Sequence, residues 1–315
     1  MKYISDLKES ERISGVYLVK SKQTALTKAG KPYENLILQD KSGTIDSKVW
    51  DVDSPGIGDY DELDYIDIVG DVTSFQGKLQ LNVKRIRRAL EGEYDPADYL
   101  PVSKYDIEEM YSELKGLISS VKNEYLNKLL DSFFADEEFA KVFKKHSAAK
   151  TMHHGFVGGL LEHTLSVAKI CDYFAGRYEI LNRDLLISAA IMHDIGKTEE
   201  LSAFPANNYT DDGQLLGHII IGTMKIKEHI KDIPGFPQKL ESELEHCILA
   251  HHGELEFGSP KKPALVEAIA LSMADNLDAK MEMFAESLAN VPGNSFDWLG
   301  FNRGLDSNIR RTSEW

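Results

Sequence analysis

Residues 191–197 read IMHDIGK and place a histidine and an aspartate side by side at the end of an apolar run. The segment that contains them, 183–194, is apolar nearly all round, which is typical of a central helix in a bundle. A buried, ionised carboxylate without a partner is energetically costly. A metal ion bound by His193 and Asp194 would remove that cost, so this stretch predicts a buried metal site.

Further histidines and an aspartate occur in similar apolar surroundings. They are His163 in GGLLEHTLSV, His218 in LLGHIIIG, His251 and His252 in ILAHHG, and Asp275 in AIALSMADNL. Each segment has helical periodicity, and bundles commonly build metal sites from side chains on facing helices. A single histidine is more often an ordinary core or surface residue, but the whole set favours a metal site. His251 and His252 are alternatives, because adjacent helical residues point about 100° apart.

A glycine-rich loop, MHHGFVGG at 152–159, precedes the segment with His163. His153 and His154 in this loop have two interpretations, a plain loop turn or a lid that faces substrate over the metals. Gly196 and Gly253 follow their helices, where glycine commonly terminates a helix in the left-handed conformation. We therefore expect both glycines to be helix caps.

The first part of the chain alternates apolar and polar residues over short stretches. The stretches are RISGVYLVKS, YENLILQD, TIDSKVW, YIDIVGDVTSF and LQLNVKRIRR, within residues 12–88. Five strands joined by short turns predict a small barrel. Residues 33–50, YENLILQDKSGTIDSKVW, resemble the strand-turn-strand unit of OB-fold nucleic-acid-binding domains. Another small β-barrel or a sandwich is the alternative.

These patterns predict an α+β multidomain protein. We expect an OB-like five-stranded β-barrel at 1–90, a linker at 91–104, an all-α helical bundle at 105–295 and a C-terminal extension at 296–315. Residues 1–90 hold 14 basic and 14 acidic residues, whereas the remaining 225 hold 22 and 37 and carry the whole net charge of −15. We therefore expect two units of different net charge. The excess carboxylates of the acidic unit would include some that bind cations.

The barrel also contains the strongest basic run, KRIRR at 84–88. Basic residues can follow a nucleic-acid backbone, and aromatic residues can stack on bases. The candidates for nucleic-acid binding are Lys20, Lys22, Tyr33, Trp50, Lys84, Arg85, Arg87 and Arg88, and Tyr17 and Phe75 are further stacking candidates. The alternative is a solvated strand end and aromatic residues that fill the barrel core.

The chain has two cysteines, Cys171 and Cys247, both in apolar helical segments. We expect two buried thiols rather than a disulfide. The first ten residues lack an apolar signal region, and no run approaches the ~18 apolar residues of a membrane span. These features predict a cytoplasmic protein without a membrane partner.

The order His, His-Asp, His, His-His, Asp resembles the HD superfamily of metal-dependent phosphohydrolases over about 155–285. The resemblance implies that His163, His193, Asp194 and Asp275 bind a first metal ion. It also implies that His218, with His251 or His252, binds a second, with Asp194 as the bridge. Lys197 matches the family lysine that contacts the substrate phosphate, so Asp194 and Lys197 are the expected catalytic residues.

The whole layout resembles the YhaM family, through HHGFVGGLLEHT, HDIGK, LLGHIIIG, LAHHGELEFGSPKKP and MADNLDAKM. Members are bacterial 3′→5′ exoribonucleases with an OB-type domain before an HD domain. The resemblance implies metal-dependent hydrolysis of single-stranded RNA to nucleoside 5′-monophosphates, with manganese or cobalt. The resemblance implies two metal ions. Imidazole and carboxylate ligands suit Mn²⁺ as the first choice, and Co²⁺, Fe²⁺, Ni²⁺ or Zn²⁺ as alternatives. The direction of cleavage comes from the resemblance alone.

Two other functions remain as alternatives. One is an HD phosphohydrolase that acts on small or signalling nucleotides, which needs no barrel to bind a polymer. The other is a non-catalytic binding protein in which the metals are structural. Single-stranded DNA as a second substrate and assembly into a homo-oligomer both stay open.

Overall fold

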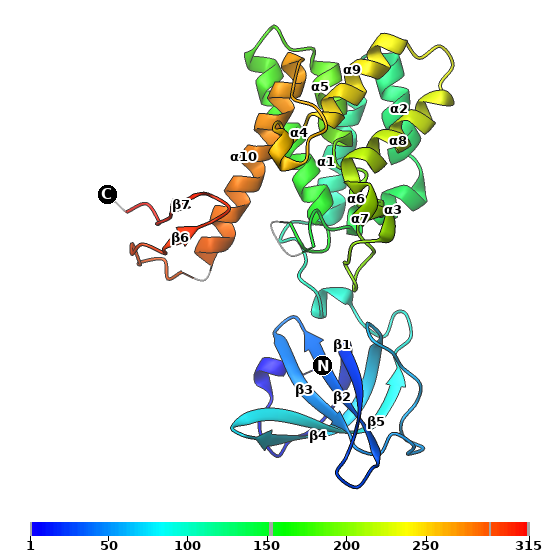
Figure 1. Ribbon diagram of the computed structural model, residues 1–315, viewed down its shortest axis with the longest axis vertical. Coiled ribbons are helices and arrows are strands. Elements are labelled where there is room, and N and C mark those ends of the chain that lie inside the picture. Colours follow the sequence, from blue (N-terminus) through cyan, green and yellow to red (C-terminus); the bar gives the residue numbers. More distant parts are fainter. Residues whose placement is uncertain (1, 151–153, 290, 314–315) are drawn as a thin grey trace. The chain divides into compact units, whose positions relative to one another are not determined.

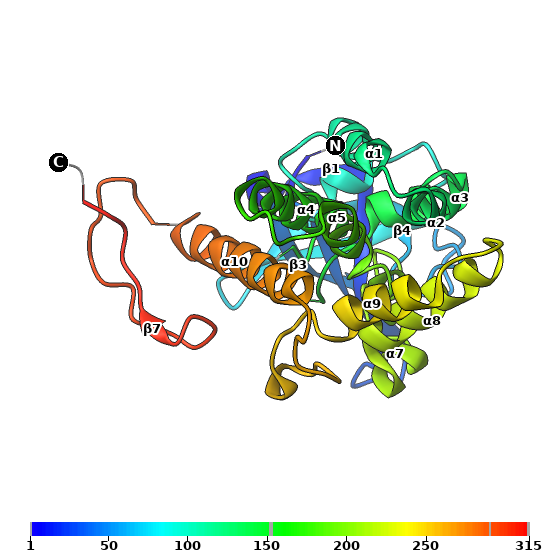
Figure 2. The same ribbon diagram turned by 90° about the horizontal axis from the view of Figure 1, so that it is seen from above.

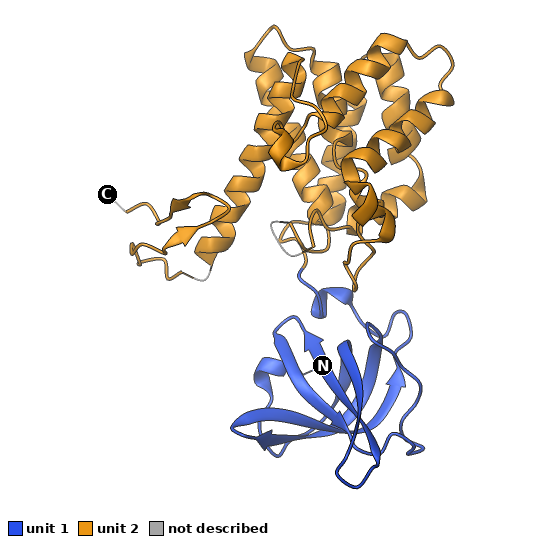
Figure 3. Cartoon of the chain, viewed as in Figure 1, with its two compact units in different colours: residues 1–101 blue, residues 102–315 orange. Residues whose placement is uncertain are grey.

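The computed structural model describes residues 2–150, 154–289 and 291–313. The chain divides into two compact units, residues 1–101 and 102–315 (Figure 3). The first is a β-barrel and the second is mostly helical (Figure 1). Among the described residues, no helix combines the length and the apolar character that crossing a membrane requires.

The barrel closes in the strand order β1-β2-β3-β5-β4. Its strands are β1 (Arg12–Leu26), β2 (Pro32–Asp40), β3 (Gly43–Val49), β4 (Tyr65–Phe75) and β5 (Lys78–Arg88). Strands β3 and β5 pair in parallel, and the other neighbours pair antiparallel. This five-stranded closed barrel confirms the OB-like prediction.

The two-residue alternation of each strand separates the core from the surface. Leu36 and Leu38 of β2 point into the core, whereas Tyr33 and Asn35 of the same strand are only partly buried. Tyr17 is 1% exposed and its hydroxyl donates a hydrogen bond to a backbone carbonyl (2.7 Å). Tyr17 therefore fills the barrel core, which is the alternative to a stacking face that the sequence allows. Phe75, in contrast, is exposed.

The helical unit begins with α1 (Ile107–Ser120), α2 (Glu124–Phe134), α3 (Glu137–Lys145), α4 (Gly159–Arg177) and α5 (Arg183–Met192). It continues with α6 (Lys197–Glu200), α7 (Asp211–Leu215), α8 (Gly217–Lys231), α9 (Gln238–Leu249) and α10 (Val266–Ala289). Asp106, Asn123, Asp136 and Asn182 cap α1, α2, α3 and α5, since their side chains accept hydrogen bonds from first-turn N–H groups. Residues 185–192 of α5 are all buried, so α5 lies centrally, as its all-round apolar sequence predicts.

Two details of the helical unit differ from the sequence-based expectation. The periodic segment at 213–232 is broken into α7 and α8 at Gly217, which has φ +74°. Gly196 has φ −64° and directly precedes α6, so it is not a left-handed cap. A Cβ atom at Gly196 would lie 2.0 Å from the backbone oxygen of His218. Glycine is thus needed there for the close approach of α6 and α8, whereas Gly253 does have a positive φ of +80°.

A small hairpin of β6 (Phe301–Asn302) and β7 (Ser307–Asn308) follows α10. Figure 2 shows α10 running out of the bundle toward this hairpin. The C-terminal extension predicted from the sequence therefore has structure of its own at residues 301–308.

Candidate metal centre

Four of the predicted ligands converge where α4, α5 and α10 meet. Nε2 of His163 lies 3.2 Å from Nε2 of His193, 3.4 Å from Oδ2 of Asp194 and 3.2 Å from Oδ1 of Asp275. Nε2 of His193 lies 3.4 Å from the same oxygen of Asp194. Ligands held at ~2.1 Å from one ion are roughly 3.0–3.4 Å apart, so these spacings fit a shared cation.

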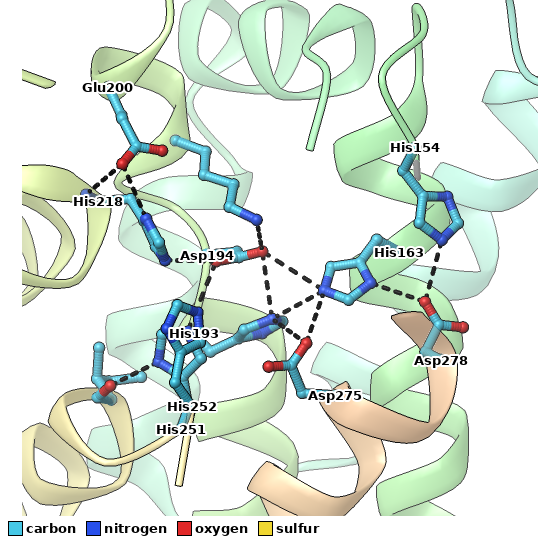
Figure 4. A network of polar contacts seen from close by, with 12 residues as sticks. His154, His163, His193, Asp194, Glu200, His218, His251, His252, Asp275 and Asp278 are labelled. Atoms are coloured by element: carbon cyan, nitrogen blue, oxygen red, sulfur yellow. Dashed lines mark hydrogen bonds and ion pairs between the residues drawn. The ribbon is translucent and has the colours of Figure 1, made fainter. Parts of the chain in front are cut away.

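A second group lies on the other side of the Asp194 carboxylate (Figure 4). Nε2 of His218 is 3.4 Å and Nε2 of His251 is 3.8 Å from Oδ1 of Asp194. His252 joins this group, because single nitrogens of His218, His251 and His252 lie within 4.8 Å of one another. Each oxygen of Asp194 therefore faces a different group, which is the arrangement that a bridging carboxylate requires.

The imidazole rings are oriented by hydrogen bonds on the side away from these groups. Nδ1 of His193, of His251 and of His252 lies 2.7, 2.6 and 2.8 Å from a backbone carbonyl oxygen. Nδ1 of His218 lies 3.0 Å from Oε1 of Glu200. Since a ring nitrogen beside an acceptor carries the proton, Nε2 of each ring keeps a lone pair for a metal.

Several buried polar atoms in the centre have no hydrogen-bond partner. They are Oδ1 of Asp194 and Nε2 of His218 and of His251. Unpaired buried polar atoms are rare in folded proteins, and these three face one another in the second group. A cation bound among them would satisfy all three, so the residues present fit a divalent metal.

The electrostatics agree with this assignment. Burial opposes protonation of His163, but hydrogen bonds to Asp275 and Asp278 outweigh it and raise its pKa to about 10. Burial also opposes ionisation of Asp194, yet the positive charge of Lys197 and the neighbouring histidines hold its pKa well below the usual value. Burial keeps the pKa of His251 low, so its ring is neutral. The pocket thus combines ionised carboxylates with a neutral His251 and a protonated His163, and a metal cation would take the place of the His163 proton.

The structure brings His251 and His252 into the same group, so both are candidates to bind the second ion. His251 is fully buried, and His252 is half-buried beside it with ring centroids 4.3 Å apart. They follow α9, which ends at Leu249. Outside regular helical geometry, adjacent side chains are free to converge.

Lys197 begins α6 and lies next to the centre. Its Nζ is 2.7 Å from Oδ2 of Asp194. Burial disfavours its charge, but the nearby Asp194 carboxylate outweighs burial and raises the pKa of Lys197 above its usual value. The ammonium is therefore positively charged and is held at the edge of the first group.

Sequence reasoning missed two carboxylates that support the ligands. Oδ2 of Asp278 lies 2.7 Å from Nδ1 of His163 and 3.1 Å from Nε2 of His154, and Ser166 hydrogen-bonds its other oxygen. Asp278 follows Asp275 by three residues, and that helical spacing was the available signal. Glu200, which anchors His218, lies three residues after Lys197 in the same way.

The sequence allows either a loop turn or a substrate-facing lid for His154. It is 3% exposed, and its contact with Asp278 ties the loop to α10. His153 lies outside the described residues.

The barrel places the nucleic-acid candidates in different settings. The rings of Tyr33 and Trp50 stack with centroids 4.9 Å apart, and Trp50 is 47% exposed. Lys20, Lys84 and Arg85 are exposed, and none forms an ion pair with a described carboxylate.

The other basic candidates are engaged with acidic groups. Lys22 contacts the Glu34 carboxylate (3.3 Å) and donates to a backbone carbonyl. Arg87 pairs with Asp67 and Glu93 (2.8 and 2.7 Å). Arg88 pairs with Asp64 (2.5 Å). The basic run at 84–88 is thus divided between unpaired and paired cations.

Comparisons with known proteins agree with this architecture. Residues 160–280 match the family model of the HD domain. The second OB-fold domain of replication protein A from Methanococcus maripaludis matches 30% of this chain and 98% of that domain, at 21% identity and a TM-score of 0.23. At that TM-score the likeness carries no argument.

Full-length relatives are more informative. The chain is 34% identical over 287 residues to 3′-5′ exoribonuclease YhaM of Geobacillus sp. (strain WCH70), covering 91% of this chain and 88% of the relative. It is 35% identical over 289 residues to 3′-5′ exoribonuclease YhaM of Bacillus subtilis (strain 168), covering 90% of each. Because the identity extends over nearly the whole of both chains, the chain belongs to the YhaM family.

Proposed function

We infer that this chain is a metal-dependent 3′→5′ exoribonuclease, a hydrolase of phosphodiester bonds in RNA. The observation that carries this inference is the position of the Asp194 carboxylate between two groups of candidate ligands. Its Oδ2 faces His163 and His193, and its Oδ1 faces His218 and His251. Relatives at about 35% identity over 90% of the chain are named 3′-5′ exoribonuclease, which favours this function over hydrolysis of small nucleotides.

The proposed first metal ligands are His163, His193, Asp194 and Asp275. The proposed second group is Asp194 with His218, His251 and His252. When bound, two such cations neutralise charge on the attacked phosphate and polarise the attacking water. Mixed imidazole and carboxylate ligands suit Mn²⁺ as the first choice, and Co²⁺, Fe²⁺, Ni²⁺ or Zn²⁺ as alternatives.

Lys197 supplies a positive charge that the protein itself holds in place. Its ammonium contacts Asp194 and is within reach of a phosphate that lies over the first group. A non-bridging phosphate oxygen gains negative charge as water attacks, and a preorganised ammonium stabilises that charge. Asp194 and Lys197 are therefore the proposed catalytic residues.

The barrel is proposed to bind the single strand. The stacked Tyr33 and Trp50 offer an exposed aromatic face, and Lys84 and Arg85 carry charges that no described carboxylate neutralises. Stacking together with phosphate contacts gives affinity without sequence preference. Arg87 and Arg88 are paired and contribute less. The buried, unlinked Cys171 and Cys247 agree with a reducing, cytoplasmic setting.

A gel assay tests the proposal. Metal-stripped protein is given 5′-labelled single-stranded RNA and Mn²⁺, and the released products are identified. We expect a ladder that shortens from the 3′ end, release of nucleoside 5′-monophosphates, and no cleavage by Asp194→Ala. A matched single-stranded DNA and a set of small nucleotides are run in parallel. Intact RNA together with hydrolysis of a small nucleotide would favour the alternative activity.

A further inference from the structure

A cleft of about 710 Å³ extends from the metal centre to the turn of the β6–β7 hairpin. His163, Lys197 and Asp275 line one part, and the turn residues Arg303 and Asp306 line another. Pockets for small ligands enclose about 300–1,000 Å³, so this cleft holds far more than one phosphate group. The hairpin therefore forms a wall of the same cleft that contains the candidate metal centre.

One face of α10 forms the floor of the cleft. Asp275, Asn276, Lys280 and Met283 all line it and follow one another along the helix. The eight residue steps from Asp275 to Met283 span about 12 Å at the helical rise of 1.5 Å. A stacked strand rises ~3.4 Å per nucleotide, so this floor has room for more than one nucleotide.

The hairpin is held firmly on α10. The Asn302 side chain donates to Oγ of Ser287 (3.3 Å), and Arg311 donates to a backbone carbonyl in the last turn of α10 (3.2 Å). A Cβ atom at Gly304 would lie 2.6 Å from Sδ of Met283, so the turn packs directly against the helix. The position of the turn over the cleft is therefore fixed by its own contacts.

Two cations of the cleft have no acidic partner among the described residues. Lys280 and Arg303 are exposed, and neither forms an ion pair with a carboxylate in the described parts of the chain. Glu254, also on the wall, is already paired with Lys262 (2.6 Å). Asp306 lies in the same turn but makes no such pair with Arg303. Unpaired cations in a unit with excess negative charge point to an anionic ligand.

We propose that Lys280 and Arg303 form a subsite for the RNA phosphates on the 5′ side of the bond that is cut. This inference rests on the proposed exoribonuclease function. The 3′-terminal nucleoside is joined to the chain by one phosphodiester, and that phosphate lies at the metal centre during cleavage. Every further phosphate of the strand lies 5′ to it. Cations farther along the cleft therefore meet only these upstream phosphates.

Substrate length separates this subsite from the metal centre. A dinucleotide without a terminal phosphate has one phosphate, whereas a hexanucleotide has several upstream ones. For the double variant Lys280→Gln/Arg303→Gln, kcat/KM on the hexanucleotide falls at least about tenfold, because hydrogen bonds between two charged side chains and phosphates are lost. Its kcat/KM on the dinucleotide stays at the wild-type value. The salt dependence of log(kcat/KM) on the hexanucleotide also decreases by about 0.7 for each lost contact.

The control is Arg310→Gln, because Arg310 is exposed near the same hairpin, lies over the Trp298 ring and does not line the cleft. It leaves both rates unchanged. Lys280→Arg/Arg303→Lys keeps the charges and restores most of the hexanucleotide rate. Equal losses on both substrates, or no loss on either, would overturn the subsite while leaving the nuclease intact. If the wild-type protein cleaves neither RNA, the proposed function falls and the subsite falls with it.

Discussion

Nδ1 of His163 lies 2.7 Å from Oδ2 of Asp278, while Nε2 of the same ring faces His193 and Asp275. The carboxylate thus fixes both the proton position and the orientation of a proposed metal ligand. Burial opposes ionisation of Asp278, but hydrogen bonds to His154 and His163 outweigh it and keep its pKa below the usual value. Asp278 is a positioning residue that acts through His163.

The Asp278→Asn variant tests this relationship. It keeps the shape but removes the charge, so we expect affinity for the first Mn²⁺ to fall about 10–100-fold. The affinity is measured by isothermal titration calorimetry. Glu282→Gln, four residues further along α10, is the matched control and keeps wild-type affinity. Unchanged Mn²⁺ affinity in Asp278→Asn would show that the contact has no part in metal binding.

Glu200 has the equivalent position for the second group. Its Oε1 lies 3.0 Å from both the backbone N–H and Nδ1 of His218. Glu200→Gln should lower the affinity for the second ion about 10–100-fold and leave the affinity for the first ion unchanged. At a fixed, moderate Mn²⁺ concentration, metal analysis should then find one ion per chain where the wild type has two. Glu199→Gln, its exposed neighbour, should retain both, and loss of both ions from Glu200→Gln would contradict the assignment.

The contact between α6 and α8 depends on Gly196. A Cβ atom added at Gly196 would lie 2.0 Å from the backbone oxygen of His218. A Cβ atom added at Gly222 would lie 3.3 Å from the backbone nitrogen of Gly196. Gly196→Ala should therefore destabilise the fold by roughly 1–3 kcal/mol and displace His218 from the centre. Gly222→Ala should be nearly neutral. Thermal unfolding and Mn²⁺ stoichiometry measure both effects, and equal behaviour of the two variants would refute this reasoning.

His146 predicts a pH dependence of stability away from the metal centre. It is 3% exposed, and burial lowers its pKa from 6.5 to about 4. The unfolded chain binds a proton below pH 6.5, but the folded chain binds it only near pH 4. His146 therefore favours the folded state fully above pH 6.5, and this contribution is lost as the pH falls toward 4.

The loss amounts to at most about 3 kcal/mol, since one unit of pKa corresponds to ~1.4 kcal/mol. In urea unfolding at pH 7.5 and 4.5, with Mn²⁺ present, His146→Leu should lose less stability than the wild type. His246→Leu is the comparison, because His246 is less buried and should retain most of the pH dependence. Parallel curves for His146→Leu and the wild type would contradict the assigned pKa.

Trp50 tests the role of the barrel. Its ring stacks on Tyr33 and is 47% exposed, and loss of a base-stacking ring costs about 1–3 kcal/mol per base. Trp50→Ala should therefore weaken binding of single-stranded RNA at least several-fold in fluorescence anisotropy. Leu26→Ala, an exposed apolar residue at the end of β1, is the control. Equal affinities for the two variants would remove Trp50 from the proposed interface.

The candidate ligands stand out in the sequence, because each is a costly polar residue in an apolar helical segment. His163, His193 and Asp275 stand out in this way, and the structure brings them together. The barrel is also predictable, since two-residue alternation and short turns are local signals. The break at Gly217 was missed because helical periodicity continues on both sides of it.

The supporting residues have only a weak signal in the sequence, which is their three-residue spacing from Asp275 and from Lys197. Glu200 belongs to a four-residue helix, which is too short to show periodicity. Asp278 looks like any acidic residue on a long helix until the fold brings α4 beside it. Tyr17 and Trp50 are both aromatic residues in the barrel segment, and only the closed barrel decides which is inside. These distinctions depend on tertiary contacts rather than on sequence spacing.

Asp275 is the last of the proposed ligands in chain order, and the turn at Arg303 follows it. A nascent chain that ends just after His252 contains the proposed histidine ligands but lacks this carboxylate and the floor of the cleft. The order of the elements therefore delays activity until α10 has been made. During most of its own translation, the chain therefore lacks a complete first group of proposed metal ligands.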